Sequence, residues 1–212
     1  MDRIAPFTEL EIDALKELMN TGVGRSARAM SELLNRQVRL NVPRVCVLDN
    51  ESRADFVNAE FIPDTRYAIA KQGFMGLFEG TGLFILPYDE CLSMAGMIGL
   101  SEDLTESMVP DIIEELSNLV LVSCVGFIAS SLGKKCSFTT PEFQKARESC
   151  AEGCESLLEA DMVSLGFRTA LRFRDSDADA HLILTMSGSS LPWLKEALGA
   201  YIEGLQCSTI SG

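Results

Sequence analysis

The sequence predicts an α+β fold, a tandem duplication of a helix plus antiparallel-strand unit, with long helices packed on a β-sheet. A polar motif with the spacing Asp-x3-Glu-x2-Asn occurs twice at a constant offset. Each copy lies in a helix-like segment that is followed by strand-like segments and then by a second helix. No long Pro, Gly or Ser-rich linker separates the halves. We therefore expect one domain over residues 1–212, with repeat halves at about 8–100 and 106–205 related by internal pseudo-two-fold symmetry.

The repeated motif is the strongest functional signal in the chain. Its copies are Asp13, Glu17 and Asn20, and then Asp111, Glu115 and Asn118, which follow 98 residues later in every case. Positions i, i+4 and i+7 of an α-helix share one face, so each copy presents two carboxylates and a carboxamide along one edge. A single edge of this kind is usually the solvated side of an amphipathic helix. The duplication, and a proline 23 positions after each asparagine (Pro43 and Pro141), favour a functional site.

The first helix is expected to start after Thr8. Thr8 and Glu11 have the spacing of a capping box, and Phe7 and Ile12 are placed to close a hydrophobic staple over it. Apolar residues then recur with helical spacing as far as Leu34 and leave the polar motif off the main apolar stripe. The first copy of the motif is therefore predicted to face away from the core.

Two glycines, Gly22 and Gly24, interrupt this helix. Each costs up to about 1 kcal/mol relative to alanine in a helix interior, so we expect close packing against a neighbouring element there. The second helix that carries the motif has Pro110, which suits a first turn. This helix is apolar on almost every side, so it is predicted to be more thoroughly buried, with Asn118 partly covered.

Strand-like segments follow each of these helices. Alternation predicts strands over Val38–Val47, Tyr67–Lys71, Phe74–Glu79 and Leu83–Leu86, and in the second half over Cys136–Pro141, Val163–Phe167, Thr169–Phe173 and His181–Met186. Pro43 and Pro141 should lie on a sheet edge, at a strand end or at a bulge. Turns are expected at Gly80–Gly82 and at Asp175–Asp179.

Each half is expected to close with a helix. These closing helices span Asp89–Ile98 and Pro192–Leu205, and Ser190 suits the cap of the second. The stretch that joins the halves, from Gly99 to Glu106, is short and polar. Two halves of this size can build one shared core.

Composition limits the classes of partner. The net charge of −13 argues against nucleic acid, because phosphate backbones are bound by clustered Lys and Arg, and it disfavours anionic membrane surfaces. We find no signal peptide and no apolar run long enough to span a membrane, since Leu119–Leu132 is too short. Seven cysteines, an odd number without a disulfide framework, are typical of a reducing compartment, so a cytoplasmic protein is expected.

Other reactive residues give weaker signals. Cys150 and Cys154 resemble half of a metal site, but there is no second close pair, and we expect no metal site in this chain. His181 falls in a predicted strand and is interpreted as structural. No histidine lies near the Ser and Thr pairs at 139–140 and 189–190, so a Ser-His-Asp triad has no support. The aspartates at 175, 177 and 179 lack the glycine and glutamate of a calcium loop.

The side chains of the repeated motif suit a reaction centre that belongs to another protein. Asparagine is neither an acid nor a base, but its carboxamide can hold a water by donating and accepting hydrogen bonds, as water-positioning residues do in phosphoryl transfer. Glutamate can pair with a cation on a partner and so fix where the asparagine lands.

The motif resembles the signature of the CheC-type chemotaxis phosphatases. The resemblance covers nearly the whole chain and rests on both copies, on the prolines, and on the flanking stretches 13–24, 33–36 and 42–45. It implies hydrolysis of the aspartyl phosphate of a CheY-like response regulator, with Mg²⁺ bound by the regulator and no cofactor in this chain. The resemblance implies that Asn20 and Asn118 orient the attacking water and that Glu17 and Glu115 dock on a lysine of the regulator. It implies a supporting role for Asp13 and Asp111.

The chain also departs from that family, and other interpretations exist. Relatives commonly carry glycine before each asparagine, whereas this chain has Met19 and Ser117, which can alter how closely a partner approaches. The main alternative is a non-enzymatic binding module, either a flagellar-switch-like scaffold or a regulator that captures the deamidase CheD. A further alternative is an adaptor whose acidic edges are only solvated. The two intact Glu and Asn pairs favour the phosphatase, with which CheD binding is compatible.

Overall fold

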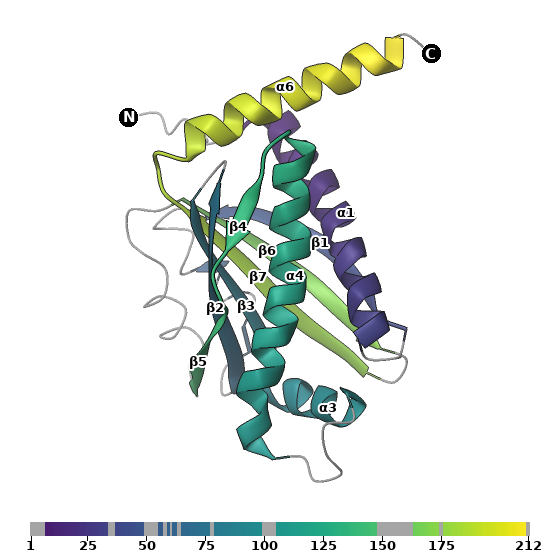
Figure 1. The fold of residues 1–212 in the computed structure, drawn as a ribbon, viewed down its shortest axis with the longest axis vertical. Coiled ribbons are helices and arrows are strands. Elements are labelled where there is room, and N and C mark those ends of the chain that lie inside the picture. Colours follow the sequence, from purple (N-terminus) through teal and green to yellow (C-terminus); the bar gives the residue numbers. More distant parts are fainter. Residues whose placement is uncertain are drawn as a thin grey trace.

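A seven-stranded antiparallel sheet forms one layer of the molecule, and helices α1 and α4 lie side by side across one of its faces (Figure 1). The structure, a computed structural model, describes residues 7–33, 37–48, 55–56, 59, 61–62, 65–76, 79–98, 105–147, 163–173 and 176–210. Its helices are α1 (Glu9–Leu33), α3 (Tyr88–Ile98), α4 (Val109–Ser131) and α6 (Leu191–Ile210), with a short 3-10 helix, η1 (Glu106–Met108). Its strands are β1 (Arg39–Leu48), β2 (Tyr67–Gly76), β3 (Gly80–Pro87), β4 (Cys136–Phe138), β5 (Glu142–Arg147), β6 (Val163–Phe173) and β7 (Ser176–Met186).

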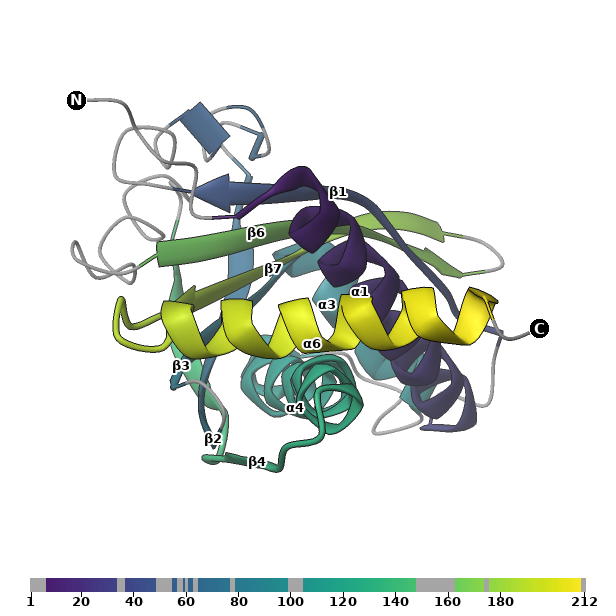
Figure 2. The same cartoon turned by 90° about the horizontal axis from the view of Figure 1, so that it is seen from above.

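The strand order is β1-β6-β7-β3-β2-β4, and β5 pairs with β2 as well. The sequence halves meet where β3 pairs with β7, and there Phe84 lies opposite Leu182. Helix α6 crosses the ends of α1 and α4, as the view from above shows (Figure 2). The expected α+β fold, with long helices on an antiparallel sheet, is therefore confirmed.

The core lies between the two long helices and the covered face of the sheet. It includes Leu15, Leu18 and Met19 of α1, Leu116 and Val120 of α4, and Ala70, Phe84 and Leu182 of the sheet, all at most 2% exposed. Burying one large apolar side chain of this kind stabilises the fold by about 1.5–3 kcal/mol. Because these residues fix the inner face of each helix, the polar motif is directed to the outer edge.

Two predicted pairs of strands are in fact single strands. The range Tyr67–Lys71 and the first residues of Phe74–Glu79 belong to one strand that runs on to Gly76, while residues 77 and 78 lie outside the described part. The ranges Val163–Phe167 and Thr169–Phe173 merge in the same way into β6. In β2 the apparent break was Gly73, where a Cβ would lie 3.1 Å from the Thr139 side chain. The glycine therefore allows a close approach within a continuous strand. Strand β5 was not predicted.

The predicted turns are also displaced. Gly80 and Gly82 belong to β3, and a Cβ at Gly82 would collide with Leu121 of α4. Asp177 and Asp179 belong to β7, since β6 and β7 pair as far as Phe173 and Ser176. Only residues 174 and 175, outside the described part, join these two strands. Gly82 makes room for α4 on the sheet, and Gly80 makes room for the Phe74 ring and the Thr185 carbonyl, contacts that local turn statistics do not register.

The predicted start of α1 is confirmed. The Thr8 main-chain N–H donates to Oε2 of Glu11 (2.6 Å), and the Glu11 N–H donates to the Thr8 hydroxyl (3.2 Å), as in a capping box. Phe7 is buried, and Ile12 packs against the core beside it. This cap sets the rotation of the helix and hence the direction of Asp13, one turn further on.

The prediction for the two glycines of α1 is confirmed for one of them. A Cβ at Gly22 would lie 2.8 Å from Cα of Cys124, so this glycine allows α1 and α4 to approach closely. Gly24 is exposed and would meet nothing within 4 Å, so the prediction was wrong there. Close packing at Gly22 brings the two helices that carry the motif into direct contact.

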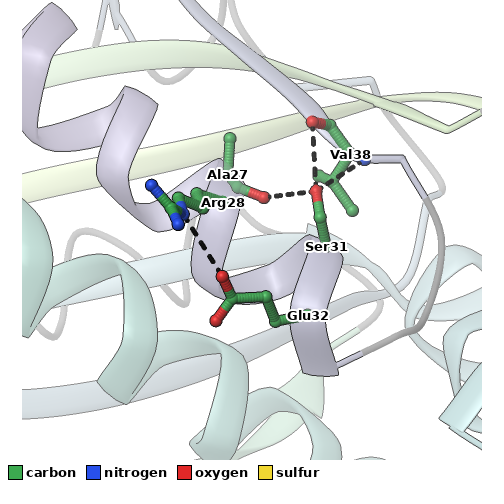
Figure 3. A network of polar contacts seen from close by, with 5 residues as sticks. All are labelled: Ala27, Arg28, Ser31, Glu32 and Val38. Atoms are coloured by element: carbon green, nitrogen blue, oxygen red, sulfur yellow. Dashed lines mark hydrogen bonds and ion pairs between the residues drawn. The ribbon is translucent and has the colours of Figure 1, made fainter.

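Ser31 ties the last turn of α1 to the start of β1 (Figure 3). Its hydroxyl donates to the main-chain oxygen of Ala27 (2.6 Å) and accepts the N–H of Val38 (2.9 Å). On the neighbouring outer edge, Arg28 pairs with Glu32 at 3.2 Å. The Ser31 bridge positions β1, where the register shifts between Asn41 and Arg44. Pro43 falls in that irregularity on an edge strand, as predicted.

Replacing Ser31 with alanine is expected to destabilise the fold by about 1–2 kcal/mol, because the partly buried N–H of Val38 loses its acceptor. Urea unfolding followed by circular dichroism measures this change. As a control, Glu32→Ala removes only an exposed ion pair, which is worth about 0–1 kcal/mol. Equal stability of the Ser31→Ala and wild-type proteins would contradict the assigned bridge.

Helix α4 ends at Ser131 and is capped by Gly133. Gly133 has φ +71°, and the N–H groups of Gly133 and Lys134 donate to the oxygens of Ser130 and Ala129 in a Schellman arrangement. The sequence was expected to contain no apolar run of spanning length, but among the described residues the segment Glu106–Ser131 is long and apolar enough to cross a membrane by length and composition, and 56% of its most apolar window is buried inside the fold. Core helices pass the same test, and α4 contacts α1, β2 and β3.

Candidate functional site

The first copy of the motif lies on the exposed edge of α1. Asp13, Glu17 and Asn20 are all exposed, while the neighbouring Leu18 and Met19 are buried. Lys16 Nζ donates to Oδ1 of Asp13 at 2.9 Å. Burial of the intervening apolar residues therefore turns this copy outward, as the helical pattern predicts.

The second copy lies on α4 in a groove of about 470 Å³. The groove is lined from the helix by Asp111, Glu114, Glu115 and Asn118, and from the opposite side by Phe138, Thr139, Thr140 and Pro141. Asp111 and Glu115 are exposed, whereas Asn118 is half-buried, as the apolar character of α4 led us to expect. The structure thus brings Asn118 and Pro141 to the same groove, although 23 positions separate them in the sequence.

A buried hydrogen-bond network holds Asn118. Nε2 of Gln72 in β2 donates to Oδ1 of Asn118 (3.0 Å) and to the main-chain oxygen of Thr139 (2.8 Å). Gln72 is 1% exposed. One side chain from the sheet therefore joins the helix wall of the groove to its loop wall.

The loop wall of the groove is fixed by further bonds. The main-chain N–H of Thr139 donates to the oxygen of Gly73 (3.0 Å), and the Gly73 N–H donates to the Thr139 hydroxyl (2.9 Å). Oε1 of Glu114 accepts the N–H of Phe143 at 2.7 Å. The loop between β4 and β5 is thus attached to β2, and the start of β5 is attached to α4.

The two copies differ in their surroundings. In the repeat register Glu114 corresponds to Lys16, so the second copy has a third carboxylate where the first has a cation. Pro141 lines the groove of the second copy, while the side chain of Pro43 lies outside the described part of the structure. The two motif helices are therefore alike in sequence spacing and unlike in local charge.

Sequence reasoning missed Gln72, Glu114 and Thr139. A signal for Gln72 exists, because Ala68, Ala70 and Phe74 on the same face of β2 are all buried in the core. A carboxamide at a core-facing position of a strand is unusual, and its burial is costly unless it has a hydrogen-bond partner. Glu114 and Thr139 gave no signal, since their contacts join segments far apart in the chain.

The other reactive residues make no second centre in the described part of the chain. No group of three or more His, Cys, Asp and Glu side chains there could hold a metal ion, and Cys150 and Cys154 lie outside it. His181 is 1% exposed, with its ring centroid 4.5 Å from that of Phe61. It packs within the sheet as a structural residue, in the strand where it was predicted.

Burial makes two thiols poor nucleophiles. It raises the pKa of the Cys91 and Cys124 thiols to about 12, and for Cys124 the contact with Oγ of Ser26 (3.6 Å) partly opposes the effect. Because the thiolate is the reactive form, these two residues are structural. In contrast to these two thiols, the acidic and amide side chains of the motif are accessible to a partner.

Known proteins resemble this chain in sequence and in fold. A family model described as the CheC-like family matches residues 10–47, which include the first copy of the motif and Pro43. The CheY-P phosphatase CheC of Bacillus subtilis (strain 168) is 26% identical over 202 residues, which cover 91% of this chain and 95% of that protein.

Solved structures share the fold at lower identity. FliY of Thermotoga maritima has a TM-score of 0.72 at 14% identity and covers 92% of this chain and 98% of its own. The FliM middle domain from H. pylori has a TM-score of 0.64 at 7% identity and covers 90% of this chain and 99% of its own. Together with the family match and the curated relative, they confirm the resemblance to the CheC family that the repeated motif predicts.

Proposed function

We propose that this protein is a phosphatase that hydrolyses the aspartyl phosphate of a CheY-like response regulator. The observation that carries the proposal is that both Asp-Glu-Asn triplets lie on accessible edges of α1 and α4, where a partner can reach them. The name of the Bacillus subtilis relative, a CheY-P phosphatase, supports the same activity. The proposed place of action is the cytoplasm.

In the proposed reaction this chain supplies positioning groups to a centre on the partner. Glu17 or Glu115 pairs with a lysine of the regulator and fixes the approach. Asn20 or Asn118 holds a water in line with the phosphorus, as water-positioning residues do in phosphoryl transfer. The water oxygen bonds to phosphorus, the bond from phosphorus to the aspartyl oxygen breaks, and inorganic phosphate leaves with the water's proton passing to solvent or phosphate. Mg²⁺ on the regulator neutralises the phosphoryl charge.

The duplication is proposed as the origin of two such sites. Two observations on the sheet support this proposal. The order of the strands across the sheet stays the same when the two halves are exchanged. The pairing of β3 with β7 is centred on Phe84 and Leu182, which are 98 residues apart. Ser26 and Cys124, also 98 residues apart, contact each other where α1 and α4 cross. The proposed pseudo-two-fold axis passes through these pairs and relates α1 to α4 and one triplet to the other.

A binding module without turnover is the competing function. It predicts that the same helix edges capture a regulator, or a partner such as CheD, and leave the phosphate intact. CheD binding stays a separate proposal, because it is compatible with hydrolysis. A pull-down of CheD, run beside the hydrolysis assay, separates the two functions.

The direct test is a dephosphorylation assay with each response regulator of the same organism. The regulator is phosphorylated with a small-molecule phosphodonor in the presence of Mg²⁺, the donor is removed, and the loss of aspartyl phosphate is followed with and without this protein. We expect faster loss for at least one regulator. Capture of a phosphorylated regulator with an unchanged rate of loss would favour the binding module.

Replacing both docking carboxylates with glutamine, Glu17→Gln with Glu115→Gln, is expected to raise KM and to change kcat less. The ion pairs of these carboxylates guide the approach of the regulator, and the substitutions leave the water-holding asparagines in place. An exposed ion pair is worth up to about 1 kcal/mol, so the rise in KM is about fivefold. Steady-state kinetics at two ionic strengths measure it, and the salt dependence of kcat/KM should weaken. An unchanged KM and salt dependence would exclude the docking role.

A further inference from the structure

Gln72 is a buried polar residue whose hydrogen-bonding capacity is only partly used. It is 1% exposed and occupies a core-facing position of β2 between Ala70 and Phe74. A buried carboxamide is costly unless it is hydrogen-bonded, and Oε1 of Gln72 accepts no hydrogen bond within the described part of the chain. An incompletely paired group of this kind requires a reason other than stability.

The bonds of Gln72 determine how the carboxamide of Asn118 is oriented. The main-chain oxygen of Thr139 can only accept, so the Gln72 atom 2.8 Å from it must be the amino nitrogen. The Asn118 atom that lies 3.0 Å from the same nitrogen must then be an acceptor, which is Oδ1. The fixed polarity of the backbone carbonyl therefore determines the orientation of both carboxamides.

We infer that Gln72 is the positioning residue of the second site: by holding Oδ1 of Asn118 and the Thr139 carbonyl together, it fixes the asparagine in one orientation before the regulator binds. The inference rests on the proposed function. With Oδ1 held, the Nδ2 donors and the second lone pair of Oδ1 are left for the groove. These are the groups that can hold a water and contact a phosphoryl oxygen. Fixing them in advance reduces the entropy lost when the reaction geometry is reached.

Among the described residues, no side chain holds Asn20 in this way. The counterpart of Gln72 in the other half can be found through strand pairing. Gln72 lies opposite Gly82 of β3, and the residue 98 positions after Gly82 is Ala180, which lies opposite Thr169. By pairing, Thr169 is therefore the counterpart of Gln72. Counting 98 positions directly from Gln72 gives Ala170 instead. Neither residue has a carboxamide. Asn20 is exposed, so it takes up its reactive orientation only against the partner.

The test is a pair of comparisons in which each site is studied alone. In the Asn20→Ala protein, where only the second site works, adding Gln72→Met should lower kcat about tenfold with KM unchanged, because misplacement of a positioned group acts on the chemical step. Methionine keeps the length and unbranched shape of glutamine without its donors. In a double-mutant cycle with Asn118→Ala, the effect of Gln72→Met should be non-additive, since it acts through Asn118.

Two results would overturn the inference: an equal fall of kcat from Gln72→Met in the Asn20→Ala and Asn118→Ala proteins, or no fall in the Asn20→Ala protein. Gln72→Leu is the second variant, because its side chain has no donor for either acceptor, and it should behave as Gln72→Met does. Circular dichroism and thermal melting identify any variant that does not fold.

A separate readout distinguishes failure of the inference from failure of the proposed function. Side-chain ¹⁵N relaxation should show a restricted amide group for Asn118, a mobile one for Asn20, and a mobile Asn118 after Gln72→Met. If wild-type protein had no phosphatase activity, the proposed function would fail and this measurement would decide whether Gln72 orders Asn118. Equal mobility of Asn118 with and without Gln72 would overturn the inference whatever the activity.

Discussion

Replacing Asn20 and Asn118 together with alanine should reduce the acceleration of regulator dephosphorylation to background. Each residue is proposed to hold the attacking water at one site, and removing a single group that is preorganised for a transition state commonly lowers the rate about 10²–10³-fold. Each single variant should keep part of the activity, because the other triplet remains. The initial rate of aspartyl phosphate loss is the quantity to measure.

The matched control is Thr21→Ala, which removes an exposed polar side chain beside Asn20 and should leave the rate unchanged. Binding of the phosphorylated regulator by the double variant should persist, since Glu17 and Glu115 are intact. Full activity in the double variant would remove the water-positioning role from both asparagines. Complete loss in one single variant would show that only one triplet works.

The same substitution at two glycines of α1 should change stability in opposite directions. At Gly22 a new Cβ would lie 2.8 Å from Cα of Cys124, so Gly22→Ala must push α1 and α4 apart at an overpacking cost of about 1–3 kcal/mol. At Gly24 nothing lies within 4 Å, so Gly24→Ala should gain up to about 1 kcal/mol from helix propensity. Urea unfolding of the two variants measures the difference directly.

Gly24→Ala serves as the control for any general effect of alanine in this helix. Because Gly22 lies two residues beyond Asn20, Gly22→Ala should also lower phosphatase activity, while Gly24→Ala should not. Stabilisation by Gly22→Ala would contradict the close packing of α1 on α4.

Features encoded by local spacing were predictable from the sequence. The cap formed by Thr8 and Glu11 and the outward direction of the first triplet follow from contacts within two turns of a helix. The position of Pro43 at an irregularity on an edge strand follows from its missing N–H. In each case the determining interaction lies near the residue in the chain.

Features that depend on distant pairing were not predictable. Gly82 was interpreted as part of a turn, and Gly73 fell in the gap between two predicted strands, yet both glycines make room for other elements, Thr139 at Gly73 and Leu121 at Gly82. The bond from Gln72 to Asn118 spans 46 positions, and the bond from Gln72 to Thr139 spans 67. No local periodicity encodes such contacts, which exist only once β2, α4 and the loop before β5 have assembled.

The proposed phosphatase removes phosphate from a regulator by turnover. The most direct measurement is the rate of aspartyl phosphate loss from the cognate regulator, with Mg²⁺ present and this protein well below the regulator in concentration. We predict that each molecule clears many regulators, with a rate that saturates as regulator is added and falls to background in the Asn20→Ala, Asn118→Ala protein. An unchanged rate of loss, even with this protein at stoichiometric concentration, would contradict the account.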